Sequence, residues 1–143
     1  MAVINVGAES STLVLNGKAI TDMVSGDIIT LTPANPSTVQ INSTNGGVNI
    51  NQRSDRQVYD LTMRVQRQSG SDVFLNNSLR QAPAVVFNGS LKEGYSRDGV
   101  DGVESWILEG GSITSQPTKT VNNEDGNALS EYTIRFRSAT RNI

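Results

Sequence analysis

The stretch that decides the fold is TVQINSTNGGVNINQR, residues 38–53, in which two short alternating runs flank a turn sequence. Val39 and Ile41 alternate with polar residues before the turn, and Val48 and Ile50 do so after it. A two-residue period places successive side chains on opposite faces of a strand. The stretch therefore predicts a long β-hairpin with one face on a core and the other face polar.

The polar positions of this hairpin are mostly uncharged amides, namely Gln40, Asn42, Asn49 and Asn51. Charged residues make up 18% of the whole chain, below the ~25% of ordinary soluble domains. Amides and hydroxyls cost less to desolvate than ions, so such a surface tolerates contact with another protein. The hairpin thus suits subunit pairing or the lining of a wet channel better than catalysis. A merely polar β-protein rich in turns is the alternative.

Length and composition set the broad class. The 143 residues are enough for one domain with its own core, and we expect residues 1–143 to form a single domain. The absence of cysteine excludes a disulfide framework and fits folding inside a cell. A net charge of −2 does not call for nucleic acid or anionic lipid as a partner. Neither a secretion signal nor an apolar run near the ~20 residues of a membrane helix is present, so no membrane insertion is expected.

The remaining chain reads as strands with one helix. We expect a flexible N-terminal arm over residues 1–11, a tight hairpin at Asn16-Gly17, and strands over 27–32, 56–66, around Trp106 and over 129–138. A helix lies between a capping serine near Ser69 and Pro83. Residues 115–127 form a long polar loop. Six Asn-Gly or Asp-Gly pairs favour a turn-dense antiparallel architecture. The expected fold is mainly β: two packed antiparallel sheets, as a β-sandwich or half-barrel, with one α-helix and a long extended hairpin.

Residues capable of chemistry are few. Without His or Cys, Ser–His–Asp and Cys–His systems and the usual zinc sites are excluded. No phosphate-binding glycine motif is present. We therefore expect no enzyme, no cofactor and no metal. Asp98, Asp101 and Glu104 can be drawn as calcium ligands, but their spacing is not that of an EF-hand, and turns explain the Asp-Gly pairs.

Arginines near the central strand raise the question of nucleic acid. Arg64 shares one face of its strand with Asp60 and Thr62, and no series of exposed aromatic residues is available to stack bases. We interpret this face as a solvated or subunit-facing surface carrying ion pairs. Arg135, Arg137 and Arg141 have the same interpretation.

The order of elements resembles that of a known family. The resemblance is carried by Asp55–Met63 (DRQVYDLTM) running into Ser71–Asn76 (SDVFLN), and by the closing YTIRF of residues 132–136. It covers most of residues 12–138. In these features the chain resembles the tail tube proteins of contractile-tailed bacteriophages, which are related to secretion-system tube proteins.

This resemblance implies six-subunit rings stacked into a hollow tube inside a contractile sheath, with neighbouring sheets joined into one barrel. The implied partners are other copies of the chain, the sheath, baseplate and tail-terminator proteins, and DNA in transit during ejection. The implied location is the virion, after assembly in the host cytoplasm. The hairpin amides Gln40, Asn42, Asn49 and Asn51 are candidates for the lumen wall, or else face the next ring or the sheath. Ring-to-ring contacts are expected at the N-terminal arm, the 115–127 loop and the hairpin tip, Ser43, Thr44, Asn45, Gly46 and Gly47.

Two further hypotheses stay open. One is a baseplate or terminator ring, or a secretion-system tube. The other is a β-sandwich module that binds carbohydrate or protein, although seven aromatic residues are few for a sugar-binding platform.

Overall fold

The structure is a computed structural model that describes residues 3–21, 29–119 and 129–143. Its larger sheet has seven antiparallel strands in the order β2-β1-β7-β8-β9-β6-β3, and its smaller sheet is the pair β4-β5. The bounds of the strands and of the single helix are as follows: β1 Ile4–Leu15, β2 Lys18–Ile20, β3 Ile29–Pro33, β4 Thr38–Asn42, β5 Val48–Gln52, β6 Tyr59–Gln66, α1 Gly70–Leu79, β7 Phe87–Arg97, β8 Val100–Ser115 and β9 Leu129–Asn142.

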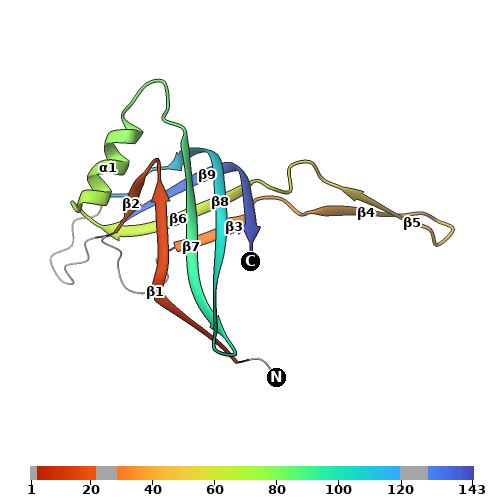
Figure 1. Ribbon diagram of the computed structural model, residues 1–143. Coiled ribbons are helices and arrows are strands. Elements are labelled where there is room, and N and C mark those ends of the chain that lie inside the picture. The colour runs from red at the N-terminus through yellow and green to blue at the C-terminus, as the bar shows by residue number, and fades with distance from the viewer. Residues whose placement is uncertain (1–2, 22–28, 120–128) are drawn as a thin grey trace.

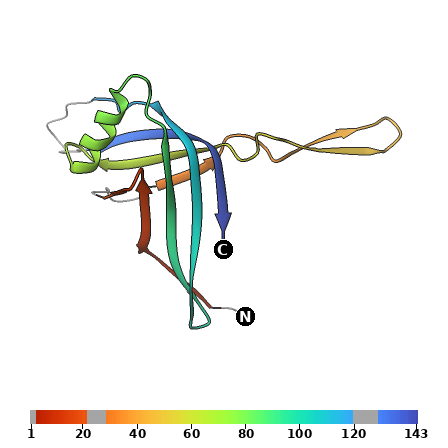
Figure 2. The same cartoon turned by 45° about the horizontal axis from the view of Figure 1, so that its top comes forward.

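The predicted class is confirmed: the fold is mainly β, with two antiparallel sheets, one helix and an extended hairpin. The seven-stranded sheet bends over a core but does not close into a barrel. The second sheet is the hairpin itself, and it projects away from the larger sheet rather than packing on it (Figure 1). Figure 2 shows the same projection from another side. No helix in the described parts of the chain is long and apolar enough to span a membrane.

The core lies on the inner side of the bent sheet. Strands β6 and β9 pair in register, with Leu61 opposite Ile134 and Met63 opposite Tyr132. Each of these four side chains is at most 1% exposed. The alternation of β9 predicted this burial correctly, because residues two apart in a strand share a face. Helix α1 covers one end of the core (Figure 1), where Leu75 is fully buried.

The helix begins where its capping residues predict. Ser69 is the N-cap, and its hydroxyl accepts a hydrogen bond from the amide of Asp72 at 3.3 Å. This bond satisfies one of the amide donors left free at a helix start. The helix ends at Leu79, short of the expected limit at Pro83, and Ala82 lies beyond it and is exposed.

Two elements differ from the sequence-based expectation. The flexible arm predicted over residues 1–11 is wrong from Ile4 onward, since β1 starts there and pairs with β7. Val3 also exchanges backbone and side-chain hydrogen bonds with Asp98. Of the loop expected over 115–127, residues 116–119 have no regular structure, and residues 120–127 lie outside the described residues. Residues 27 and 28 of the strand expected over 27–32 lie outside them as well.

The Asn-Gly and Asp-Gly pairs divide into two kinds. Three of them form turns with positive φ, at Asn16-Gly17, Asn45-Gly46 and Asp98-Gly99. Two lie inside strands, where the predicted turns are wrong. A Cβ on Gly89 would stand 1.9 Å from the Val14 carbonyl oxygen, and one on Gly102 would stand 2.5 Å from the Tyr95 ring. Glycine is needed there for close approach, not for chain reversal. The pair at residues 125–126 lies outside the described residues.

Candidate assembly interface

The β4–β5 hairpin, residues 38–52, is the most unusual surface of the molecule, and we call it the arm. All ten residues of its two strands are exposed. Its aliphatic residues are exposed by 40–63%: Val39, Ile41, Val48 and Ile50. The expected burial of one face of this hairpin on a core is therefore not found within the described part of the chain. An isolated two-stranded hairpin is at best marginally stable in water, so the arm needs a partner surface to cover it.

The register of the arm also corrects the predicted amide face. Gln40 lies opposite Ile50 and Asn42 opposite Val48, whereas Asn49 lies opposite Ile41 and Asn51 opposite Val39. Residues directly opposite each other in an antiparallel pair share a face. The four amides are thus divided two and two, and each face of the arm mixes amides with aliphatic side chains. A single wall made of all four amides is excluded by this geometry.

The tip of the arm is a closed turn. The Ser43 amide donates to the Gly47 carbonyl at 2.8 Å, and the Ser43 hydroxyl accepts from the Gly47 amide at 3.0 Å. Gly46 has φ +79°. All five tip residues are exposed, and no charged residue occurs anywhere from Thr38 to Gln52. The tip is available for contact, with its own hydrogen bonds holding its shape.

The base of the arm is held to the body by a group of hydrogen bonds, which we call the collar. Arg53 forms two hydrogen bonds of 2.8 Å to the Asp55 carboxylate, and this guanidinium keeps the pKa of Asp55 below its usual value. The Ala34 amide donates to the Val58 carbonyl at 2.9 Å, and the Ala139 amide donates to the Gln57 carbonyl at 3.0 Å. The bond from Ala139 joins the segment between the arm and β6 to β9. The collar fixes the direction in which the arm leaves the sheet.

At both ends of the larger sheet, strand edges have no partner among the described strands. Strand β3 is the last in the sheet order and pairs only with β6. At the other end, β2 pairs with Leu13–Leu15 of β1 and leaves residues 4–12 without a described strand on that side. Open strand edges present unpaired backbone donors and acceptors that can pair with another chain.

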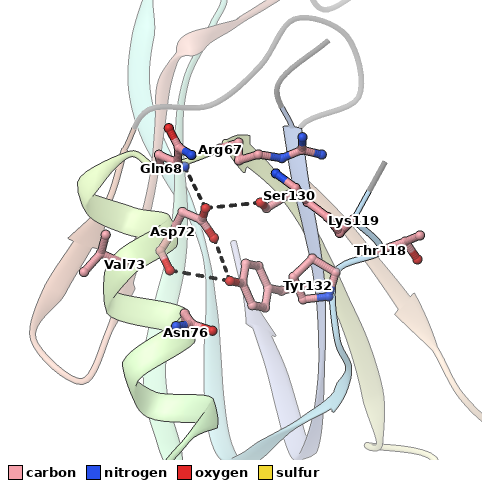
Figure 3. A pocket seen from close by; sticks show the side chains of 10 residues that line it. Arg67, Gln68, Asp72, Val73, Asn76, Thr118, Lys119, Ser130 and Tyr132 are labelled. Atoms are coloured by element: carbon pink, nitrogen blue, oxygen red, sulfur yellow. Dashed lines mark hydrogen bonds between the residues drawn. The ribbon is translucent and has the colours of Figure 1, made fainter. Parts of the chain in front are cut away.

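An open pocket of about 350 Å³ lies beside the start of α1, lined by Arg67, Lys119, Asp72 and Tyr132 among others (Figure 3). The Asp72 carboxylate accepts hydrogen bonds from the Tyr132 hydroxyl at 2.6 Å, the Ser130 hydroxyl at 3.2 Å and the backbone amide of Gln68 at 2.8 Å. Burial and this carboxylate raise the pKa of Tyr132. The bonds from Tyr132 and Ser130 join the helix to β9 and hold these pocket side chains in place.

The other candidate residues do not converge on a site. Asp98 accepts from the Val3 amide, and Glu104 pairs with Arg141. In the part of the chain that the structure describes, no three acidic residues come close enough to hold a metal ion. The predicted ion-paired arginine faces are confirmed, since Arg135 lies 2.8 Å from Asp60 and Arg64 3.5 Å from Glu131.

Sequence reasoning missed the Asp72–Tyr132 contact and the open edge of β1. The contact joins residues 60 positions apart, and nothing local in the sequence marks that pairing. The edge was hidden because the side-chain pattern after Val6 is weak. No local signal marks this edge, because its partner β7 contains the Asn88-Gly89 pair that predicted a turn.

Comparison with known proteins shows the fold and not the family. No protein-family model matches the sequence, and no curated protein matches it. Among solved structures, the chain is similar to one in the extended sheath–tube complex of PVC, an extracellular contractile injection system, with a TM-score of 0.65 and 12% identity over 96% of this chain and 91% of that chain. It is equally similar to the tube-terminating cap of the anti-feeding prophage, with a TM-score of 0.65 and 13% identity over 96% and 91% of the two chains.

A third match is the extended sheath/tube terminator of PVC, with a TM-score of 0.65 and 11% identity over 97% of both chains. The fold is therefore the one found in tube and terminator assemblies of contractile injection systems, as the resemblance in the sequence implied.

Proposed function

We propose that this chain is the ring-forming subunit of an inner tail tube. In this proposal, six copies form a ring, rings stack into a hollow tube inside a contractile sheath, and the tube conducts DNA during ejection. The fold is the first support, because it matches chains of tube and terminator assemblies over almost its whole length.

The observation that carries the proposal is the fully exposed arm. Ile41 and Ile50 are 56% and 63% exposed on an uncharged hairpin that no other described part of the chain covers. Exposed aliphatic side chains without nearby charges are typical of a surface that another protein covers. In a stack of identical rings, a neighbouring copy supplies that cover at every position.

Open strand edges support ring closure. Pairing the β3 edge of one copy with a free strand edge of the next copy would continue the sheet around the ring. A closed sheet has no free edges, which removes the tendency toward uncontrolled pairing. Ring closure would therefore satisfy backbone groups that the single chain leaves without strand partners.

In this proposal the tip of the arm makes the contacts between rings. The exposed residues Ser43–Gly47 would touch the next ring, while sheath, baseplate and terminator proteins meet the outside and the ends of the tube. Assembly would take place in the host cytoplasm before the tail joins the virion. The mixed amide and aliphatic faces of the arm fit lateral contacts, since they combine apolar area with uncharged hydrogen-bonding groups.

Negative-stain electron microscopy of the concentrated protein tests the proposal. The unaltered chain should form rings and long tubes. A variant lacking Thr44–Gly47 should form rings that do not stack, with an unchanged circular dichroism spectrum as the control for folding. A protein that stays monomeric at high concentration would contradict the proposal, and unaltered tubes from the deletion variant would contradict the role of the tip.

The second candidate is a terminator or cap ring, which two of the structural matches favour. A terminator forms one ring and stops growth, whereas a tube subunit adds rings without limit. Tube length against protein concentration distinguishes them: single rings at every concentration would identify a terminator-like protein.

A further inference from the structure

The seven-stranded sheet bends where β8 and β9 pass Gly110 and Arg137. Its outward surface is therefore divided into two faces, one on each half of the sheet. Gly110 has φ +65°, and in β9 the buried side changes from Phe136 to Ala139, three residues later. Figure 2 shows β9 turning at this bend toward the C-terminus. One half of the sheet contains β3, β6, the beginning of β9 and the end of β8. The other half contains β1, β7, the beginning of β8 and the end of β9.

The outward face of the first half carries a row of hydroxyl groups across four strands, which we call the hydroxyl row. Thr30 lies opposite Thr62, Thr62 opposite Thr133, and Ser115 opposite Thr133. The hydroxyls of Thr62 and Thr133 are 3.3 Å apart, within hydrogen-bonding distance. This part of the sheet therefore presents small polar groups whose own hydrogen bonds run along the surface.

Ion pairs flank the hydroxyl row on both sides. Asp60 lies opposite Arg135, with hydrogen bonds of 2.8 and 3.1 Å, and the guanidinium keeps the pKa of Asp60 below its usual value. Arg64 lies opposite Glu131 at 3.5 Å. The four charged residues of these two rows thus neutralise one another within the chain. A nucleic-acid phosphate would have to compete with a carboxylate for each of these two guanidinium groups.

The other outward face is apolar by comparison. Val103 is 57% exposed and Ile107 43% exposed on β8, where Ile107 lies opposite Ser90 and Thr140. None of the large, exposed hydrophobic residues of the described chain lies on the hydroxyl row or the ion-paired rows beside it. Surfaces buried by permanent assembly are more apolar than surfaces left in water. The arm and the Val103–Ile107 face are therefore suited to burial between proteins, and the hydroxyl row is suited to remain in water.

We propose that the outward face of β3, β6, β9 and the end of β8, centred on Thr62 and Thr133, lines the channel of the tube. This inference rests on the proposed function and replaces the arm amides as the channel wall. A wall of hydroxyls and internally paired charges neither attracts a polyanion strongly nor offers it apolar contacts. The moving cargo that fits it is therefore a long polyanion such as double-stranded DNA, which must pass without being held.

Single cysteines test the assignment cleanly, because the chain contains no cysteine of its own. Thr62→Cys and Thr133→Cys place a thiol on the proposed channel wall, and Ile107→Cys places one on the other outward face as the matched control. Rings are labelled with a small gold particle carrying a maleimide, assembled into tubes and imaged by electron cryomicroscopy. Gold should lie along the tube axis for the two threonine variants and away from the axis for the control.

Gold on the outer surface of the tube for Thr62→Cys and Thr133→Cys would overturn the channel assignment and leave the tube function standing. Failure of the unaltered protein to form tubes would instead overturn the proposed function. If labelling prevents assembly, a reconstruction of unaltered tubes decides the question. Thr62 and Thr133 must then lie closer to the axis than Ile107, and the reverse order would reject the proposal.

Discussion

The arm and the β6–β9 pair are built from the same kind of sequence and have opposite environments. Both alternate apolar and polar residues with a period of two. In β6 and β9 the apolar residues are almost completely buried, whereas in the arm Ile41 and Ile50 are more than half exposed. Alternation thus identifies a strand and its two faces, but it does not say whether the cover comes from the same chain or from another one.

The difference has an energetic basis. Burying one large aliphatic or aromatic side chain is worth roughly 1.5–3 kcal/mol. The β6–β9 pair receives that stabilisation within the monomer, whereas the proposed assembly would supply it to the arm. Substitutions in the two regions should therefore separate folding from assembly, and the four predictions below run from the largest to the smallest expected effect on unfolding.

Phe136→Ala should have the largest effect, because this side chain is fully buried between the two halves of the sheet. We expect a loss of about 3–5 kcal/mol in the free energy of unfolding, from lost burial and the cavity left behind. Urea denaturation measures it. Arg137→Ala, at the next and exposed position, is the matched control and should cost much less; equal losses for the two variants would contradict the assigned core.

Tyr132→Phe should cost about 1.5–3 kcal/mol, because it removes a hydrogen bond to the Asp72 carboxylate. The raised pKa of Tyr132 also sets a pH dependence. In the unfolded chain the pKa of tyrosine is about 10. Above that pH the phenol ionises more readily in the unfolded chain than in the folded one, so the stability of the unaltered protein falls as pH rises. The variant should lack this alkaline loss. Tyr95→Phe serves as the control, and an identical alkaline slope in Tyr132→Phe and the unaltered protein would contradict the prediction.

Asp60→Asn should have a smaller effect that depends on pH. The hydrogen bond from Arg135 lowers the pKa of Asp60 in the folded state. The resulting stabilisation is present above pH 3.9, which is about the pKa of aspartate in the unfolded chain. It is lost as pH falls through the lower pKa of Asp60 in the folded protein. Unfolding midpoints measured toward acid pH should therefore fall less steeply in Asp60→Asn. Asp101→Asn, an exposed position on β8, should leave the slope of the unaltered protein in place.

Ile41→Ser combined with Ile50→Ser should change the free energy of unfolding least, within about 0.5 kcal/mol, as is usual for exposed positions. The same variant should lose tube formation in negative-stain images, since it removes apolar area from both faces of the arm. Gln40→Ser combined with Asn49→Ser alters the residues directly opposite and should retain tubes. Normal tubes from the isoleucine variant would show that the arm is not an assembly surface.

Much of the fold was predictable because it depends on local patterns. The alternation over residues 129–138 fixed the core face of β9, and Ser69 with Asp72 marked the start of the helix. The in-strand glycines were not predictable, because Gly89 and Gly102 are required by neighbours on adjacent strands. An Asn-Gly or Asp-Gly pair looks the same in the sequence whether it reverses the chain in a turn or allows a neighbouring strand to approach closely.

The position of the candidate site along the chain was predictable, but the arrangement of its side chains was not. The uncharged stretch of residues 38–52 marked the arm as a candidate subunit contact from its composition. Which amides share a face depends on the register across the turn, and the TNGG tip permits more than one register. The hydroxyl row joins residues from Thr30 to Thr133, so it follows from strand order, which no single stretch of sequence contains.

The bond from the Ala139 amide to the Gln57 carbonyl has a mechanical consequence. Force on the arm enters β3 and β6 directly through the backbone, and the collar passes part of it to β9, a strand hydrogen-bonded on both sides to β6 and β8. The load is thereby shared by three strands of the larger sheet instead of by the two that continue into the arm.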